Sequence, residues 1–353
     1  MRIFKILTIM IFSFTLFNSL AFTQYNADEK ALIEACKNGN LEAAKKLIRT
    51  GTDVNIVDEK KFSALIYAVK SGNLDLVKEL VKFGADVTYY GGGQIDAAFF
   101  ALDSGRNDII EYLLSKGANP TDFLFYSIYK NDINRVKEFL KKGAKANYYL
   151  TYASKKGNIE IIRELIKSGA NGFDEALYET VKAGGSPEVV KELVKNGADV
   201  NYKEADYAGS DNSPERYYDY LILYAVRSKN INTVKILIEA GADLNVYGEY
   251  EHNNPLMVAV ENNDAEMVKL LLSSGIDVNE ELENKRENIL TWCISKNRGY
   301  RYSSYKVDIK VIEALLEGGA DYNAKNYYGK NALMVAASEG REDIIELLEK
   351  YGA

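Results

Sequence analysis

Apolar residues recur along most of this chain at the spacing of amphipathic helices. The stretch SALIYAVKSGNLDLVKELVKFGADV begins at Ser63 and predicts one short helix before a break at Gly72. It then predicts a second helix, apolar on one side and charged on the other, that ends at Gly84. A glycine just past a helix supplies the left-handed backbone that ends it. Two helices this short bury too little apolar surface alone, so we expect neighbouring copies to stack on them.

Copies of this helix pair run through the whole sequence, each marked by the glycine that ends its second helix. These glycines are Gly51, Gly84, Gly117, Gly143, Gly169, Gly197, Gly241, Gly275, Gly319 and Gly352. Most of them have a small residue sixteen positions earlier, namely Ala35, Ala68, Ala101, Ser127, Ala153, Ala225, Ala259 and Ala336. A small side chain at a fixed place indicates that two helices approach closely there in each copy.

Several phrases of the sequence resemble those of ankyrin repeats. GADVN, GADLN and GADYN are similar to the family's helix-ending phrase, and SGNLDLVKEL resembles the opening of its second helix. The C-terminal NYYGKNALMVAASEGREDIIELLEKYGA resembles a nearly complete repeat. The resemblance covers residues 28–353. It implies an all-α ankyrin-repeat solenoid of about ten helix-turn-helix units, with a short β-hairpin finger between the second helix of one unit and the first helix of the next.

One family motif is degraded in this chain. The Thr-Pro-Leu-His turn appears as SALI, NPLM and NALM, and no unit keeps its histidine. Ser63, Asn254 and Asn331 stand at the corresponding starts of first helices. We expect their side-chain oxygens to cap these helices.

The spacing of the glycines changes along the chain. Gly51, Gly84 and Gly117 are 33 residues apart, whereas the steps from Gly117 to Gly197 are shorter. The shortening falls where the family has its fingers, so residues 118–197 are predicted to form finger-poor units. Insertions are predicted at about residues 202–217, in a finger, and at about 297–306, between the two helices of one unit.

The first residues have the order of a secretory signal peptide. The basic start MRIFK precedes the apolar run ILTIMIFSFTLF and the small residues of NSLAFTQ, so residues 1–23 are predicted to be removed after Ala21 or Thr23. Residues 24–353 would then be a single exported array, periplasmic or secreted. An uncleaved anchor stays open, although the apolar run falls just short of the roughly 20 residues of a spanning helix. No cysteine at the cleavage region could carry a lipid anchor.

The composition and the rare reactive residues argue against chemistry. The net charge is −7, which disfavours a nucleic-acid partner. The single histidine, His252, cannot form a metal cluster or a catalytic triad alone. We therefore expect no catalytic residue, no metal site and no cofactor. Cys36 and Cys293 lie in units too far apart for a disulfide and are expected to be buried thiols.

Tyrosines gather in or beside the predicted fingers. Ankyrin-like stacks bind proteins on the concave face formed by fingers and first helices, and tyrosine offers a large contact area at a low cost in rotamer entropy. Coding bias combined with packing between fingers is the alternative explanation. The hypothesised partner-binding residues are Tyr207, Arg216, Tyr217, Tyr218, Tyr247, Tyr250, Tyr327 and Tyr328.

The sequence thus favours an exported, non-catalytic scaffold that binds a protein partner on its concave face. We expect a monomer with no nucleic-acid partner and no membrane contact after signal cleavage. A periplasmic assembly or protective factor for a resident enzyme is the first alternative. An envelope protein held by an uncleaved signal anchor is the second, and an enzyme is the least favoured class.

Overall fold

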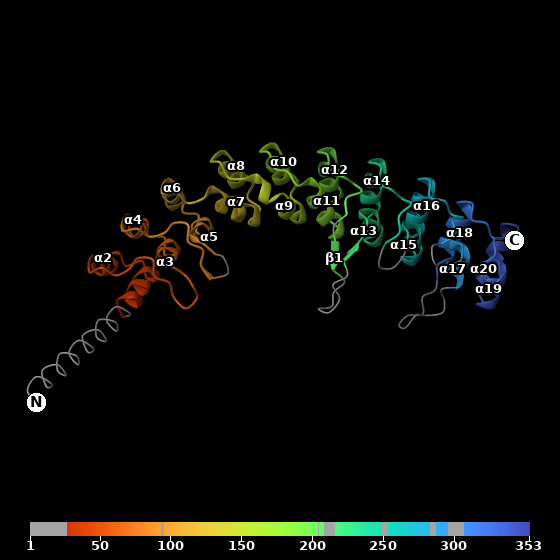
Figure 1. Ribbon diagram of the computed structural model, residues 1–353, viewed down its shortest axis with the longest axis horizontal. Coiled ribbons are helices and arrows are strands. Elements are labelled where there is room, and N and C mark those ends of the chain that lie inside the picture. The colour runs from red at the N-terminus through yellow and green to blue at the C-terminus, as the bar shows by residue number, and fades with distance from the viewer. Residues whose placement is uncertain are drawn as a thin grey trace, which may run out of the picture. The chain divides into compact units, whose positions relative to one another are not determined.

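The computed structural model describes residues 27–92, 95–203, 205–207, 216–248, 253–282, 287–295 and 307–353. The chain divides into two compact units, one up to Ala146 and one from Asn147 to Ala353 (Figure 1). Ten helix pairs lie within the described residues, and this number agrees with the all-α solenoid that the sequence predicts. The predicted signal peptide, residues 1–23, lies outside the described residues, as do the insertion at 297–306 and Tyr250.

The first unit contains four helix pairs. Its first helices pack side by side in one layer, and its second helices pack in another. A helix over residues 27–37 is followed by α2 (Leu41–Arg49), α3 (Ala64–Lys70), α4 (Leu74–Lys82), α5 (Ala97–Asp103), α6 (Asn107–Ser115), α7 (Pro120–Tyr129) and α8 (Ile133–Lys141). A 3-10 turn, η2 (Ala146–Tyr148), spans the boundary to the second unit.

The second unit contains six helix pairs with the same two layers, as the alternation of α11 and α12 with their neighbours shows (Figure 1). Its helices are α9 (Leu150–Lys156), α10 (Ile159–Lys167), α11 (Phe173–Lys182), α12 (Pro187–Lys195), α13 (Leu221–Arg227), α14 (Ile231–Glu239), α15 (Pro255–Glu261), α16 (Ala265–Ser273), α17 (Ile289–Ser295), α18 (Ile309–Glu317), α19 (Ala332–Ser338) and α20 (Glu342–Lys350). Among the helices that the structure describes, none is long and apolar enough to cross a membrane.

The first helices begin at the caps that the sequence predicts. Ser63 Oγ accepts a hydrogen bond from the Ile66 amide at 3.2 Å. Asn254 and Asn331 accept in the same way from the amides of the third residue after each, at 2.8 and 3.0 Å. These side chains satisfy amides that have no partner within the helix, which is why a divergent turn still starts a helix here.

The core lies between the layers, where the small residues allow close packing. Each of the eight small residues that precede the marker glycines is buried, with at most 7% of its surface exposed. Larger apolar side chains of the second helices, such as Leu80 and Leu165, are fully buried beside them. The repeated phrase is therefore a packing unit, and each pair completes the core of the next.

Asparagine side chains join the loops of neighbouring pairs. Asn55 Nδ2 donates to the Gly84 carbonyl at 3.0 Å, and its Oδ1 accepts from the Asp86 amide at 2.8 Å. Asn201 and Asn279 make the same two bonds to the next loop in the second unit. The final residue of the phrase GADVN thus sets the register between successive pairs.

In the first finger the structure shows a turn with a single β-bridge, so the expected β-hairpin is not confirmed there. In the first finger, the Asp58 amide donates to the Phe62 carbonyl at 3.0 Å, and a single β-bridge joins Val57 to Ser63. Among the described residues, named strands occur in one finger, where β1 (Ala205–Tyr207) pairs antiparallel with β2 (Arg216–Tyr218).

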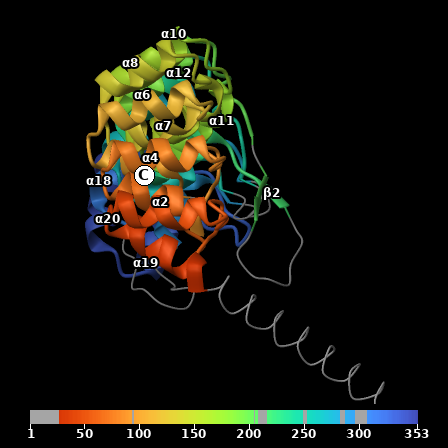
Figure 2. The same ribbon diagram turned by 90° about the vertical axis from the view of Figure 1, so that its left-hand side faces the viewer.

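The β1–β2 hairpin extends from the first-helix side of the second unit. Figures 1 and 2 both place it beyond α11, on the side that faces away from α12. Elsewhere the connections are shorter, since residues 116–119 suffice between α6 and α7 and residues 168–172 between α10 and α11. Fingers of different lengths therefore line the first-helix layer.

Candidate protein-binding surfaces

Some finger tyrosines form hydrogen bonds that hold their finger to neighbouring parts of the first unit. The Tyr89 hydroxyl donates to the Lys61 carbonyl of the preceding finger at 3.1 Å. The adjacent Tyr90 reaches the other way and donates to Asp122 Oδ1 on α7 at 2.6 Å. Packing between fingers, the alternative explanation of the tyrosine enrichment, accounts for Tyr89, whereas Tyr90 joins its finger to a helix.

A buried carboxyl, that of Asp96, lies near the half-buried Asp122. Asp96 caps α5, accepts from the Phe99 amide at 3.1 Å and is only 4% exposed. Burial raises the pKa of Asp96 to about 6, and the nearby charge of Asp122 adds to this effect. Burial also raises the pKa of Asp122 and of Tyr126 on α7. Asp96 caps α5, and Asp122 on α7 accepts a hydrogen bond from the finger residue Tyr90. We therefore assign these carboxyls a role in holding the fold together.

An aromatic ladder that the sequence did not reveal crosses three first helices of the first unit. Phe62 lies 5.9 Å from Tyr67 and 6.1 Å from Phe100, measured between ring centroids. Phe99 then bridges Phe100 and Tyr126, at 5.1 Å from each. The edge-to-face geometry is the one that aromatic pairs favour. The spacing of apolar residues predicts these helices, but it does not show which rings meet across units.

A cluster of tyrosines and cations supports the foot of the β1–β2 hairpin. The register of the two strands, extended by two residues, places Lys203 opposite Tyr220. Lys203 Nζ indeed lies 2.6 Å from the Tyr220 hydroxyl and 3.9 Å from the ring centroid. Tyr178, which is buried on α11, contacts the rings of Tyr202 and Tyr224 at 6.2 and 5.7 Å. The foot of the hairpin is therefore tied to α11 and α13.

The predicted binding residues of the hairpin are placed by their backbone. Tyr207 pairs with Arg216, Asp206 with Tyr217, and Ala205 with Tyr218. The structure thus brings four of the predicted residues into one hairpin. Tyr247 is half-buried in the following finger.

The last finger exposes the two remaining predicted residues. Tyr327 is 65% exposed and Tyr328 is 76% exposed, and their ring centroids are 5.5 Å apart. The buried Asn326 holds the turn, because its Oδ1 accepts from the amides of Tyr328 and Lys330, both at 3.1 Å. Gly329, with φ 72°, provides the left-handed residue that the turn requires. Two exposed aromatic side chains are therefore presented on a well-held loop.

The first finger has the same turn with different tips. Asp58 Oδ1 accepts from the amides of Lys60 and Phe62, both at 3.0 Å, as Asn326 does in the last finger. Its two tip residues are Glu59 and Lys60, where the last finger has tyrosines. The turn does not require aromatic tips, so the fold alone leaves Tyr327 and Tyr328 without an explanation.

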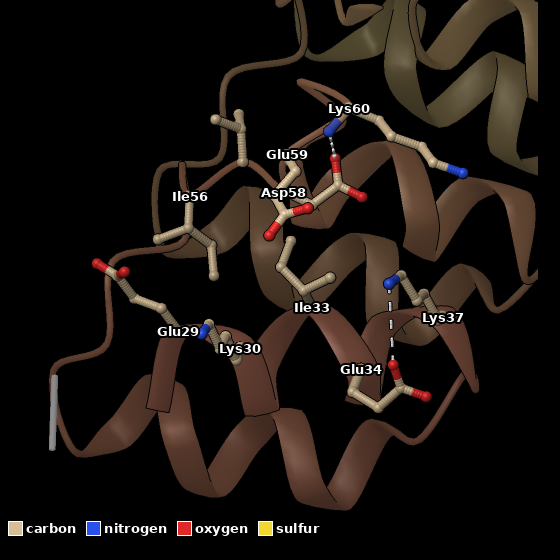
Figure 3. Close-up of a pocket in the computed structure, with 10 residues that line it drawn as sticks. Glu29, Lys30, Ile33, Glu34, Lys37, Ile56, Asp58, Glu59 and Lys60 are labelled. Carbon is tan, nitrogen blue, oxygen red and sulfur yellow. Dashed lines mark hydrogen bonds and ion pairs between the residues drawn. The ribbon is translucent and has the colours of Figure 1, made fainter. Parts of the chain in front are cut away.

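A hollow of about 440 Å³ lies between residues 27–37 and the first finger (Figure 3). Ile33 and Ile56 contribute apolar surface, while charges of both signs surround it. Glu34 Oε2 lies 3.8 Å from Lys37 Nζ. Asp58 accepts hydrogen bonds from the Phe62 amide of its own turn and, at 2.6 Å, from the Tyr67 hydroxyl.

The two cysteines are reactive groups of another kind. Cys36 and Cys293 are buried and unpaired, as expected. Burial raises the pKa of Cys36 to about 12 and also raises that of Cys293, so neither is a ready thiolate nucleophile. No group of three or more potential metal ligands occurs in the part of the chain that the structure describes.

Comparison with known proteins agrees with this architecture. A family model of ankyrin repeats in three copies matches residues 32–123, 124–204 and 208–281. A second ankyrin model, of many copies, matches residues 304–349. A search of curated proteins finds no match. The two family models together cover most of the sequence and at least part of each of the ten helix pairs.

Proposed function

This chain belongs to the ankyrin-repeat family, and from that premise we propose that it is an exported, non-catalytic scaffold that binds a partner protein through its fingers and first helices. Ankyrin repeats are protein–protein interaction modules and are generally non-catalytic. The observation that carries the proposal is the exposed pair Tyr327 and Tyr328 on the last finger.

Exposed aromatic residues on a rigid loop suit an interface for two physical reasons. A tyrosine buries a large area on binding and loses little rotamer entropy. The turn around Asn326 is already ordered by its two hydrogen bonds, so the loop pays little further entropy when it binds. The β1–β2 hairpin, with Tyr207, Arg216, Tyr217 and Tyr218, is the second proposed contact.

A comparative capture experiment tests this proposal. The purified protein and its Tyr327→Ala/Tyr328→Ala variant are each incubated with an envelope extract and with a host-cell lysate, and the bound proteins are compared by mass spectrometry. The variant Glu59→Ala/Lys60→Ala is the matched control, because it truncates the tips of the same turn in the first finger. We expect one or a few proteins to bind the wild type and the control but not the tyrosine variant.

The source of the captured protein separates two versions of the proposal. A partner from the envelope would favour an assembly or protective factor for a resident protein, and one from the lysate would favour a host target. If the tyrosine variant captures the same proteins in the same amounts as the wild type, the last finger is not the binding site.

A further inference from the structure

The first helix of the C-terminal pair, α19, leaves open a face that α15 has buried. Met334 on this helix is 53% exposed, whereas Met257, at the same position of α15, is fully buried. Ala337 is exposed where α15 has the buried Val260. Leu333 on the same face is half-buried. In α15, this face packs against the next first helix, α17.

At the N-terminal end of the array, the outer face of the first helix carries a charged residue. On the helix over residues 27–37, Ile33 and Cys36 are buried, and they correspond to Met334 and Ala337. The positions left open there are Ala31 and Glu34, where α3 has the buried Ala64 and Tyr67. A terminal unit needs a polar outer face for solubility, and Glu34 provides one. Met334 does not, so the two ends differ.

The finger that precedes α19 carries two exposed lysines. Lys325 and Lys330 flank the exposed tyrosines of the last finger, and both lysines are exposed. In the described structure neither ammonium group has an ion pair, whereas lysines such as Lys269 and Lys142 pair with glutamates at 3.0 and 2.7 Å. These lysines are thus two cations without an ion pair in a protein whose net charge is −7.

We propose that the end face, defined as Tyr327, Tyr328, Leu333, Met334 and Ala337 together with Lys325 and Lys330, docks an amphipathic α-helix of the partner protein that carries carboxylates along its flank. The inference rests on the proposed function and specifies the partner's chemistry. The shape follows from the inner units, where this face receives a helix, and the charge follows from the two lysines.

A second copy of this chain is the less suitable occupant. Its own outer first-helix face would bring the charged Glu34 and its neighbour Lys37 against Met334, and burying charged side chains on an apolar one is unfavourable. A partner helix with apolar residues in its stripe and acidic residues beside it avoids this cost. Such a helix would place its carboxylates near Lys325 and Lys330.

Selection from a helix library tests the assignment. The full protein is used to select from a displayed library of amphipathic helices about four turns long, with a fixed stripe of alanine and leucine and random flanking residues. We expect the enriched flanks to be rich in aspartate and glutamate. Met334→Glu should weaken the selected helices at least about tenfold, as measured by fluorescence anisotropy. Phe83→Glu, which removes an exposed apolar residue of the first unit, should not weaken them.

Reversal of the charge gives the sharpest outcome. Selection on the Lys325→Glu/Lys330→Glu variant should enrich basic flanks instead. Because these side chains and Met334 are exposed, the variants should keep the melting temperature of the wild type. Failure to enrich helices, enrichment with no preference in charge, or binding that Met334→Glu leaves unchanged would overturn the proposal. A dimer in sedimentation velocity that Met334→Glu dissolves would assign the face to a second copy and would also overturn it.

The experiments distinguish failure of this docking proposal from failure of the proposed binding function. Loss of partner capture in the tyrosine variant, combined with a library that yields no acidic helix, would leave the scaffold function intact and reject this occupant. Unchanged capture in the tyrosine variant would reject the last finger as the binding site, whatever the library yields.

Discussion

Asp96 shows how a single buried carboxyl can make this fold sensitive to pH. The folded protein holds its proton up to about pH 6, whereas an unfolded chain loses it near the ordinary value of 3.8. A carboxyl with a raised pKa stabilises the fold fully below the unfolded value, and this stability is lost as the pH rises through the folded value. The loss is on the order of 3 kcal/mol, from about 1.4 kcal/mol per pKa unit.

Asp96→Asn should therefore stabilise the protein at neutral pH. Asparagine keeps the cap on α5 but carries no charge that must be buried. We expect the free energy of unfolding at pH 7.5 to rise by about 1–3 kcal/mol, and the gain to shrink as the pH falls from 6 to 4. Urea denaturation at several pH values measures both effects.

The control for this exchange is Asp132→Asn, at the exposed N-cap of α8. It should change stability by no more than about 0.5 kcal/mol, as surface substitutions generally do. If Asp96→Asn destabilises the protein at pH 7.5, the buried carboxylate must gain more from its hydrogen bonds than it loses by burial.

At the scale of the element, the second helices hold the core through a few apolar side chains. Leu165 lies on α10 and is fully buried. Leu165→Ala should lower the free energy of unfolding by about 2–5 kcal/mol, because the truncation leaves a cavity. Because repeats depend mainly on their neighbours, the loss is also expected to divide unfolding into two phases. Lys167→Ala, on the exposed side of the same helix, is the matched control in thermal and urea unfolding. A change below about 0.5 kcal/mol for Leu165→Ala would contradict its place in the core.

The turn of the last finger allows the effect of loop rigidity on partner binding to be tested separately from the contact that Tyr327 and Tyr328 make. Asn326→Ala removes the acceptor of two amides and should cost about 1–3 kcal/mol of stability. It should also weaken partner binding although both tyrosines remain. Asp58→Ala removes the same turn from the first finger and should destabilise without affecting affinity. Affinity that survives in Asn326→Ala would show that the tyrosines bind without a preformed loop.

What the sequence could predict here depends on how local each feature is. The caps at Ser63 and Asn254 and the helix end at Gly84 follow from neighbouring residues, so the helix pairs could be placed. The bond from Tyr90 to Asp122 joins a finger to the helix of the next unit, and the burial of Asp96 depends on the same packing. Such contacts carry no local signal, and the tyrosine pattern alone could not separate tyrosines that make these contacts from exposed residues such as Tyr328.

At the scale of the whole molecule, export of the solenoid depends on the predicted signal peptide. The signal peptide remains a prediction, and it has a direct test in the native host. N-terminal sequencing of the protein from the envelope or medium should give Phe22 or Gln24 as the first residue, because cleavage is predicted after Ala21 or Thr23. A chain that begins at Met1 and sediments with membranes would instead support the uncleaved anchor.

The central claim is that the fingers and first helices bind a protein, and the affinity of one captured partner tests it most directly. Isothermal titration calorimetry compares the wild type with Tyr327→Ala/Tyr328→Ala and with Tyr217→Ala/Tyr218→Ala. Interface aromatics that are central contribute about 2 kcal/mol or more each, so each double variant should bind at least about tenfold more weakly with an unchanged melting temperature. Equal affinity for all three proteins would contradict the account.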